Sequence, residues 1–351
     1  MAAPSISLPE RVCVVSYRLG GTDGVSIEAA KWARAFSELG SEVVTVAGSG
    51  DADKVIGSLA ADSEERIDLD SLASALKASS LVVVENCCSL PLNPRVREAL
   101  KAVLEGRPAI LRHHDLPWQR PAFRDVAAPP DDDAWWHVTI NERSRLEMAA
   151  RGIEATTFYN CFDPVVVPGD RSATRRALEV ADGELLALQP TRAIPRKNVP
   201  GGVLFARELG ATYWLLGPAE DNYGPELGRI LERAGIRVLR GLPTGCSVAD
   251  AYAACDVVVL PSSFEGFGNP SVESALYRRP LVIGSYPVAF ELRRFGFSWF
   301  DFGDAAASAA SVRRWLADGD TRLLDRNEQV AKERFSSADL PQRLRALVTG
   351  K

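Results

Sequence analysis

The stretch from Ser262 to Glu273 reads SSFEGFGNPSVE, and its two flanks decide the fold. Before it, the apolar run Asp256–Leu260 predicts a short buried strand. After it, Pro270–Tyr277 is typical of a helix that begins at a proline. A glycine-containing turn therefore joins the carboxyl end of a strand to the start of a helix. In doubly wound parallel sheets, ligands bind at this edge.

This turn offers two kinds of ligand-binding group. Gly266 and Gly268 allow positive φ and a close approach of the backbone to a ligand. The N–H groups of residues 268–272 are expected to be free at the start of the helix, where phosphate is the ligand that usually binds. Glu265 and Glu273 have the wrong sign for phosphate and suit hydroxyl groups. Together they predict a sugar-nucleotide site, although a strand, a glycine turn and a helix occur in every doubly wound domain.

A second strand-to-helix turn carries three cations. The expected strand Leu185–Gln189 is followed by residues 190–198, which read PTRAIPRKN. Arg192 and Lys197 stand five residues apart in it, and Arg196 is expected to point to solvent. A charged surface cluster would explain this composition. The turn nevertheless follows a strand's carboxyl end, as the glutamate turn does, and cations there suit an anionic ligand.

These residues resemble a known family, the retaining nucleotide-sugar glycosyltransferases of family 4. Its hallmark is a pair of glutamates separated by seven residues with Gly-Phe-Gly between them, which Glu265 and Glu273 match. In that family an arginine and a lysine five residues apart hold the donor diphosphate, as Arg192 and Lys197 would. The resemblance implies an α/β fold of two Rossmann-like doubly wound domains facing each other across a cleft (GT-B).

The first part of the chain also reads as Rossmann-like. Strand Arg11–Ser16, helix Val25–Leu39 and strand Ser41–Ala47 form an expected βαβ unit. Gly20 and Gly21 lie between the first two elements but do not spell a dinucleotide fingerprint, so we expect no nicotinamide cofactor. The resemblance implies that this glycine pair lies against the donor phosphates and the acceptor. A tight turn explains the pair equally well.

Two of the three histidines, His113 and His114, follow the expected strand Pro108–Leu111. Such a pair before Asp115 could be structural or could bind a metal. The resemblance gives another account, because family members place a His-Asp pair at this strand end, with the histidine beside the donor sugar. His114 and Asp115 match that pair. His113 and Trp118 join Asp115 as candidate acceptor-binding residues.

The resemblance assigns roles to specific positions. The residues implied in catalysis are Glu265, His114, Arg192 and Lys197. Glu265 and His114 would orient the sugar, and Glu273 would hold the ribose hydroxyls. The residues implied in donor binding are Gly20, Gly21, Arg192, Lys197, Gly241, Leu242, Gly266, Phe267, Gly268, Asn269, Pro270, Ser271 and Glu273.

Composition limits the remaining classes. The 351 residues suggest two domains, for which we expect boundaries at 1–165 and 166–335, with a helix in 336–351 crossing back to the first domain. The formal net charge of −5 gives no support for nucleic-acid binding. Six cysteines without metal-type spacing, no apparent signal peptide and no apolar run of membrane-spanning length predict a cytoplasmic protein. Peripheral membrane contact and oligomeric state stay open.

Besides the histidine pair, one other group of residues raises the question of a metal. The tandem aspartates Asp131–Asp133 resemble metal-binding carboxylates, but they precede an expected strand after two prolines, which favours a solvated loop. The loop Pro121–Asp133 lies where the resembled family binds its acceptor. Because cations built into the fold can replace a divalent ion at a leaving diphosphate, we expect no metal requirement and no permanently bound cofactor.

The implied function is transfer of a hexose from a nucleoside-diphosphate sugar to a hydroxyl acceptor, with retention and an α-glycosidic product. GDP-mannose is favoured slightly over UDP-glucose as donor. The acceptor could be a carbohydrate, a small metabolite or a lipid headgroup. The alternatives are a sugar-nucleotide epimerase or a phosphorylase on the same fold, and a sugar-nucleotide-binding module without turnover.

Overall fold

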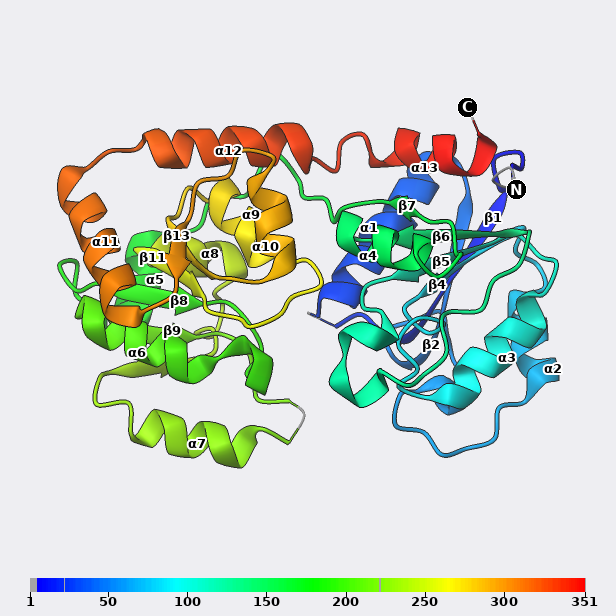
Figure 1. Ribbon diagram of the computed structural model, residues 1–351, viewed down its shortest axis with the longest axis horizontal. Coiled ribbons are helices and arrows are strands. Elements are labelled where there is room, and N and C mark those ends of the chain that lie inside the picture. The colour runs from blue at the N-terminus through cyan, green and yellow to red at the C-terminus, as the bar shows by residue number, and fades with distance from the viewer. Residues whose placement is uncertain (1–4, 22, 221, 351) are drawn as a thin grey trace. The chain divides into compact units, whose positions relative to one another are not determined.

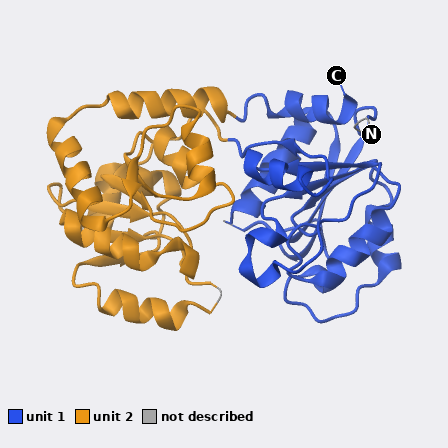
Figure 2. Ribbon diagram, viewed as in Figure 1, with its two compact units in different colours: residues 1–161, 337–351 blue, residues 162–336 orange. Residues whose placement is uncertain are grey.

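The computed structural model describes residues 5–21, 23–220 and 222–350. The chain divides into two units, Met1–Cys161 with Ser337–Lys351 and Phe162–Ser336 (Figure 2). The chain passes between the units after Cys161 and again after Ser336; we call these two places the crossing points. They lie next to each other in the second unit, where the Phe162 amide donates to the Phe335 carbonyl at 2.7 Å. These boundaries differ by four residues and by one residue from those expected at 165 and 335.

The first unit contains a seven-stranded parallel sheet in the order β3-β2-β1-β4-β5-β6-β7 (Figure 1). Its strands are β1 (Arg11–Leu19), β2 (Glu42–Gly50), β3 (Lys54–Val55), β4 (Leu81–Glu85), β5 (Ala109–His113), β6 (Trp135–Thr139) and β7 (Thr156–Thr157). The strand order reverses between β1 and β4, so the ends of these strands mark this sheet's switch point.

Helices pack against both faces of this sheet. They are α1 (Gly24–Glu38), α2 (Leu69–Leu76), α3 (Pro94–Leu104), α4 (Glu142–Ala149) and α13 (Leu340–Thr349), with short 3₁₀ turns η1 (Gly57–Leu59), η2 (Pro117–Gln119) and η3 (Pro121–Phe123). One core is formed with α2 and α3, and the other with α1 and α13. In the second core, Leu340, Leu344 and Val348 of α13 join Trp32 and Phe36 of α1. The C-terminal helix is therefore part of the first unit's core.

The second unit contains a six-stranded parallel sheet in the order β10-β9-β8-β11-β12-β13. Its strands are β8 (Leu186–Gln189), β9 (Thr212–Leu215), β10 (Val238–Arg240), β11 (Val257–Leu260), β12 (Leu281–Gly284) and β13 (Phe300–Phe302). Here the order reverses between β8 and β11, which are followed by the two turns that the sequence singled out.

Eight helices and one 3₁₀ turn are described in this unit. They are α5 (Arg171–Ala177), η4 (Pro195–Lys197), α6 (Val199–Leu209), α7 (Gly224–Glu232), α8 (Val248–Ala254), α9 (Pro270–Leu276), α10 (Pro287–Arg293), α11 (Ala305–Asp318) and α12 (Arg322–Arg334). Two parallel sheets, each with helices alternating along the chain, confirm the expected α/β class of two Rossmann-like doubly wound domains. That the two domains face each other across a cleft stays a prediction.

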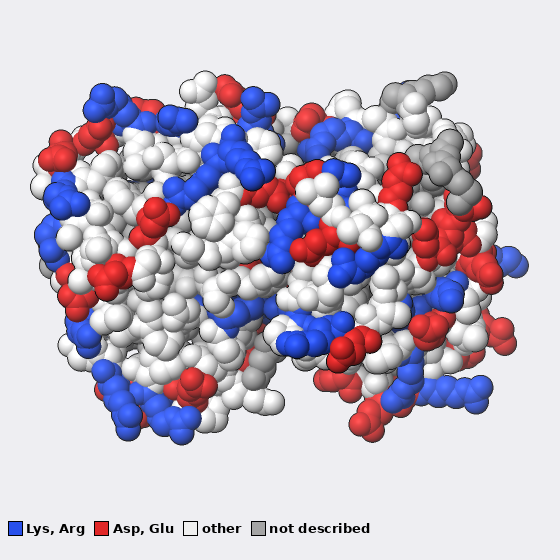
Figure 3. Space-filling view, in the orientation of Figure 1, with Lys and Arg blue, Asp and Glu red and all other residues white. Residues whose placement is uncertain are grey.

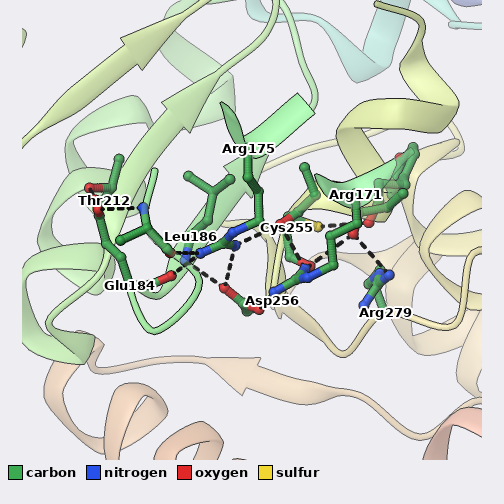
Figure 4. Close-up of polar contacts among 12 residues, drawn as sticks. Arg171, Arg175, Glu184, Leu186, Thr212, Cys255, Asp256 and Arg279 are labelled. Carbon is green, nitrogen blue, oxygen red and sulfur yellow. Dashed lines mark hydrogen bonds and ion pairs between the residues drawn. The ribbon is translucent and has the colours of Figure 1, made fainter. Parts of the chain in front are cut away.

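The amino ends of β8 and β11 are held together by Asp256 (Figure 4). Its carboxylate accepts hydrogen bonds from the Leu186 amide at 2.8 Å and from Arg171 at 2.5 Å, and it pairs with the buried Arg175 at 3.3 Å. This network fixes the alignment of the two central strands. Their carboxyl ends, and the turns that follow them, are therefore held side by side at the opposite edge.

Candidate active site

In the second unit, the two turns singled out by the sequence meet at the sheet's carboxyl edge. The Ser263 amide donates to the Arg196 carbonyl at 2.9 Å, and the Asn198 side chain donates to the Pro261 carbonyl at 3.1 Å. Asn198 adopts a left-handed conformation with φ of 52°, which ends η4 and begins α6. The cationic turn after β8 is thereby tied to the glutamate turn after β11.

Glu265 lies at the centre of this edge with its side chain only 5% exposed. Lys197 Nζ donates to both carboxylate oxygens, at 2.6 and 2.7 Å. Arg196 Nη1 donates to Oε2 at 2.7 Å, and Ser262 Oγ donates to Oε1 at 2.6 Å. A buried carboxylate is thus held by two cations and a hydroxyl group.

This environment shifts the protonation of both partners. Burial raises the pKa of the Glu265 carboxyl group, but the positive charges of Lys197 and Arg196 outweigh burial and hold this pKa at about 2. Burial also lowers the pKa of Lys197, against the attraction of Glu265, and the charge of Arg196 adds to that lowering. Glu265 is therefore ionised throughout the neutral range.

The expectation that Arg196 points to solvent is wrong. Its side chain is 20% exposed, and Nη1 contacts the Glu265 carboxylate and also the Phe264 carbonyl, at 2.8 Å. The reason is the turn of 3₁₀ helix from Pro195 to Lys197, which the glutamate turn holds through the Ser263 amide. Both consecutive cations consequently reach the same carboxylate.

Arg192 lies on the same turn but has a different partner. Its guanidinium group pairs with Glu220, and the two side chains are 35% and 30% exposed. Arg192 is therefore more accessible to solvent than Lys197, whose side chain is 10% exposed. The Arg192–Glu220 pair is screened by solvent and holds the guanidinium group weakly.

The backbone of the glutamate turn partly departs from expectation. Gly268 has φ of 89°, and a Cβ atom there would lie 2.8 Å from the Tyr286 hydroxyl, so glycine is required. Pro270 begins α9, as the sequence predicts. The prediction of free N–H groups over residues 268–272 is wrong for two residues, because Ser271 and Val272 donate to the carbonyls of Gly268 and Asn269. The helix has only seven residues, and its first turn uses these donors itself.

Three further predicted donor-binding residues lie close by. Phe267 is 3% exposed, and its ring stacks on Phe162 at 6.2 Å and meets Phe335 edge-on at 5.9 Å. Phe267 therefore anchors the turn beside the chain's two crossing points. Gly266 and Asn269 are half-buried in the same turn.

Glu273 and the turn after β10 complete the predicted donor positions in this unit. Glu273 is half-buried in the first turn of α9 and accepts a hydrogen bond from the Tyr252 hydroxyl at 2.7 Å. Gly241 has φ of 67° directly after β10, and its carbonyl accepts from the Trp214 indole at 2.8 Å. Leu242 is 38% exposed, so an apolar side chain stands in solvent at this carboxyl edge.

In the first unit, His114 belongs to a buried charge network at the ends of β4 and β5. Its Nε2 donates to Glu85 at 2.6 Å. Arg112 bridges Glu85 and Glu28, at 3.2 and 2.9 Å, and its guanidinium group lies over the Trp32 ring. Burial raises the pKa of Glu85, but Arg112 and His114 outweigh burial and lower it. The ionised Glu85 therefore fixes the tautomer and the orientation of His114.

His113 lies in a separate buried chain of hydrogen bonds. Its ring contacts Ser89 at 2.7 Å and His137 at 2.9 Å, and His137 contacts Asp131 at 3.0 Å. Burial lowers the pKa of His113 and of His137. Both ring nitrogens of His113 are thus engaged by protein groups rather than turned towards solvent.

The two other predicted acceptor-binding residues lie in the loop after β5. Asp115 pairs with Arg120 at 2.8 Å. The Trp118 indole donates to Glu147 at 2.8 Å, and the Arg151 guanidinium group lies 3.8 Å from its ring centre. Trp118 is half-buried and held in place by charged neighbours.

Gly20 and Gly21 lie at the carboxyl end of β1, beside the first unit's switch point. Gly20 has φ of 74°, and a Cβ atom there would lie 2.5 Å from that of Asp51. The backbone therefore requires glycine at residue 20 whether or not a ligand binds. Thr22, the next residue but one, lies outside the described residues.

Comparisons with known proteins show what the chain is similar to. Residues 203–318 match the family Glycosyl transferases group 1. The mannosylglucosylglycerate synthase of Thermotoga maritima is 27% identical over 84% of this chain and 85% of its own length. The enzyme of the same name from Petrotoga mobilis is 22% identical over 84% and 86%.

Solved structures support the fold. The Anabaena HepE protein in complex with UDP-glucose has a TM-score of 0.73 at 18% identity, over 95% of this chain and 98% of that one. Sucrose-phosphate synthase from Thermosynechococcus elongatus has a TM-score of 0.73 at 14% identity, over 95% and 97%. The chain is therefore a glycosyltransferase of the GT-B fold.

The sequence alone did not predict a role for several residues near the carboxyl edges of the glycosyltransferase's two sheets. Arg196 was assigned to solvent, and Glu85, Arg112 and Glu28 received no role. The signal for Glu85 and Arg112 was available, because each is a charged residue at the end of, or within, a strongly apolar strand. Glu28 carried no such signal, since an acidic residue in an amphipathic helix is ordinary.

Among the described residues, no group of three or more His, Cys, Asp or Glu side chains could hold a metal ion. Asp131 is half-exposed and contacts His137, while Asp132 accepts from the Gly106 and Ala134 amides. These aspartates therefore make local contacts within the loop and with its neighbours.

Proposed function

We propose that this enzyme transfers a hexose, with mannose favoured over glucose, from a nucleoside-diphosphate sugar to a hydroxyl acceptor, with retention and an α-linked product. Both relatives that cover 84% of the chain are named mannosylglucosylglycerate synthase. A mannosyltransferase, WbdA of Escherichia coli, is 31% identical over 24% of the chain. These names favour mannose as the sugar, and we propose GDP-mannose as its donor, whereas the HepE structure is a complex with UDP-glucose.

The observation that carries the proposal is the pair of cations at the second unit's switch point. Lys197 and Arg192 lie on the turn after β8, at the edge where doubly wound sheets bind ligands. As the sugar–oxygen bond breaks, the diphosphate gains negative charge while positive charge builds on the sugar. Fixed cations at a site sheltered from water stabilise that change most.

The remaining residues have supporting roles in this proposal. Glu273, held by Tyr252, accepts hydrogen bonds from the ribose hydroxyls. Glu265 and His114 orient the sugar, and Glu85 leaves His114 Nδ1 as the ring nitrogen that meets a sugar hydroxyl. The backbones of Gly20 and Gly21, and of residues 266–271, lie along the donor, and Gly241 with Leu242 seats the nucleobase. We assign no protein nucleophile.

For the acceptor, the names of the relatives favour a small glycoside that carries a carboxylate, such as glucosylglycerate, over a polysaccharide or a lipid headgroup. The residues proposed to meet the acceptor are Asp115, Trp118 and His113. Of these, Asp115 and Trp118 are half-buried in the loop after β5. The His113 ring is buried between Ser89 and His137, so it meets the acceptor only if one of these hydrogen bonds is exchanged.

The proposal includes metal-independent turnover in the cytoplasm. Cations already present at the diphosphate site take the place of a divalent ion. All six cysteines are free, and no helix in the described part of the chain is long and apolar enough to cross a membrane. Figure 3 shows lysine and arginine intermixed with aspartate and glutamate over the visible face, which gives no support for a polyanionic partner.

The test is incubation of the purified enzyme with GDP-mannose and with UDP-glucose, each with glucosylglycerate, a simple hexoside or no acceptor. Transfer of mannose to the glycoside supports the proposal. Epimerised nucleotide sugar without transfer indicates an epimerase. Sugar release that depends on orthophosphate indicates a phosphorylase. Binding without turnover on every acceptor would leave a sugar-nucleotide-binding module.

A further inference from the structure

Glu265 has two cationic partners, although one is enough to neutralise it. Lys197 contacts both carboxylate oxygens, and Arg196 contacts one of them from the adjacent position in the chain. The proposed function requires Lys197 to meet the donor diphosphate. Lys197 cannot keep both of its short contacts to Glu265 while it also faces a second anion.

A buried carboxylate needs a positive partner at every stage of the reaction. Glu265 is only 4% exposed, so water cannot replace Lys197 when its ammonium group turns to the diphosphate. The approaching diphosphate is itself negative and disfavours the ionised carboxylate further. With Lys197 alone, Glu265 would take up a proton as the donor binds.

We propose that Arg196 is a positioning residue that keeps Glu265 ionised and in place while Lys197 engages the leaving diphosphate. This inference rests on the proposed function, in which Lys197 binds the diphosphate. Arg196 suits the role because one nitrogen, Nη1, contacts both the Glu265 carboxylate and the Phe264 carbonyl. Arg196 thereby stabilises the negative charge of Glu265 and also holds the backbone at the start of the glutamate turn.

The groups facing Glu265 come from three segments. Lys197 and Arg196 belong to the turn after β8, and Ser262 belongs to the turn after β11. The buried Tyr286 hydroxyl at the start of α10 feels the charges of Glu265 and Arg196. Neither hydroxyl group carries a positive charge, so Arg196 is the cation that remains when Lys197 turns away.

The experiment compares wild type with Arg196→Gln and Arg196→Lys, and with Arg176→Gln, an exposed arginine on α5, as matched control. The pH profiles of kcat and of kcat/KM are measured with GDP-mannose and with the acceptor that the incubation under Proposed function identifies. The kcat profile reports the donor complex, and the kcat/KM profile reports the free enzyme, in which Lys197 still neutralises Glu265. The two profiles must therefore respond differently.

In Arg196→Gln, the acidic limb of the pH profile of kcat should move to higher pH by about 1–3 units, as expected for the loss of one adjacent opposite charge. The acidic limb of kcat/KM should move less, and Arg196→Lys and Arg176→Gln should follow wild type. A merely structural role for Arg196 predicts a uniform loss at every pH. Unmoved limbs in Arg196→Gln, or an Arg196→Lys variant as impaired as Arg196→Gln, overturn the inference.

If Arg196→Gln does not fold, the double variant Arg196→Gln/Glu265→Gln decides. It carries no carboxylate at position 265, so recovery of its melting temperature supports the inference, and failure to recover overturns it. Lys197→Ala separates the two proposals. If Lys197→Ala keeps full turnover, the diphosphate site itself is wrong. If Lys197→Ala loses turnover while Arg196→Gln keeps the wild-type profiles, only the role of Arg196 is wrong.

Discussion

Replacing Lys197 with alanine removes a cation whose side chain is 10% exposed and whose Nζ lies 2.6 and 2.7 Å from the Glu265 oxygens. Breaking a buried pair costs ~3–5 kcal/mol. Because Arg196 and Ser262 still hold Glu265, we expect a loss in unfolding free energy of about 1–3 kcal/mol, below that full range. For a unit of this size, that lowers the melting temperature by about 3–10 °C.

The effect on turnover should be much larger. Losing one charge-assisted contact to a desolvated diphosphate costs roughly 2–5 kcal/mol of transition-state stabilisation. At ~1.4 kcal/mol per decade, kcat/KM should fall about 30-fold to several thousand-fold. Arg192→Ala should lose turnover in the same way, and the double variant should be less than additive because both cations serve one anion.

The assay measures kcat/KM with GDP-mannose at saturating acceptor, together with the melting temperature of each variant. Lys332→Ala is the control, since Lys332 is a 45% exposed lysine on α12 that pairs with Glu328 on its own helix. It should lose less than about 0.5 kcal/mol of stability, as is usual for surface changes. If Lys197→Ala and Lys332→Ala had equal kcat/KM at a temperature where both are folded, the reasoning would be refuted.

Three further outcomes follow from the structure. Turnover with excess chelator should match turnover with added magnesium within about twofold, and loss of most activity in chelator would return a metal to the mechanism. Tyr252→Phe should raise the donor KM several-fold with little change in kcat, because it releases Glu273 rather than the diphosphate; an equal fall in kcat would contradict this. Phe267→Ala should lower the unfolding free energy by about 3–5 kcal/mol through the cavity left between Phe162 and Phe335, measured by denaturant titration.

The low pKa of Glu265 also predicts a pH dependence of stability. A carboxyl group whose pKa is lower in the folded than in the unfolded state stabilises the fold above its unfolded pKa, and that contribution is lost as pH falls towards the folded pKa. The unfolding free energy of wild type relative to Glu265→Gln should therefore shrink between about pH 5 and pH 2, towards the value of about 2 for Glu265. A difference that stayed constant over this range would mean that the carboxylate is not ionised by its neighbours.

Much of the fold could be predicted from local patterns. Short apolar runs alternating with amphipathic segments predicted both parallel sheets, because strands buried on two faces carry little else. Pairing was not predictable in the same way. Strand β1 continues to Leu19 because Arg18 and Leu19 pair with Ser49 and Gly50 of β2, and no local pattern reveals that partner. Likewise, no local pattern reveals that Phe162 pairs with Phe335 just beyond the unit boundary at residue 161.

In the candidate site, too, local features were predictable from the sequence and contacts between distant segments were not. Spacing within each turn predicted Glu265 and Lys197 as site residues, since glycines, a proline and charges at a strand end have local meaning. The contact of Arg196 with Glu265 joins turns 69 residues apart, and only the order of β8 and β11 in the sheet brings them together. Local spacing could not show it, and so Arg196 was assigned to solvent.

The central claim is that a hexose leaves a nucleoside diphosphate with its α configuration retained. Proton NMR of the first product formed from GDP-mannose and glucosylglycerate tests it most directly, with the one-bond carbon–proton coupling at the new anomeric centre reporting the configuration. The proposed function predicts an α-linked mannoside formed together with GDP. A β-linked product, or the absence of transfer from every nucleotide sugar offered, would contradict the account.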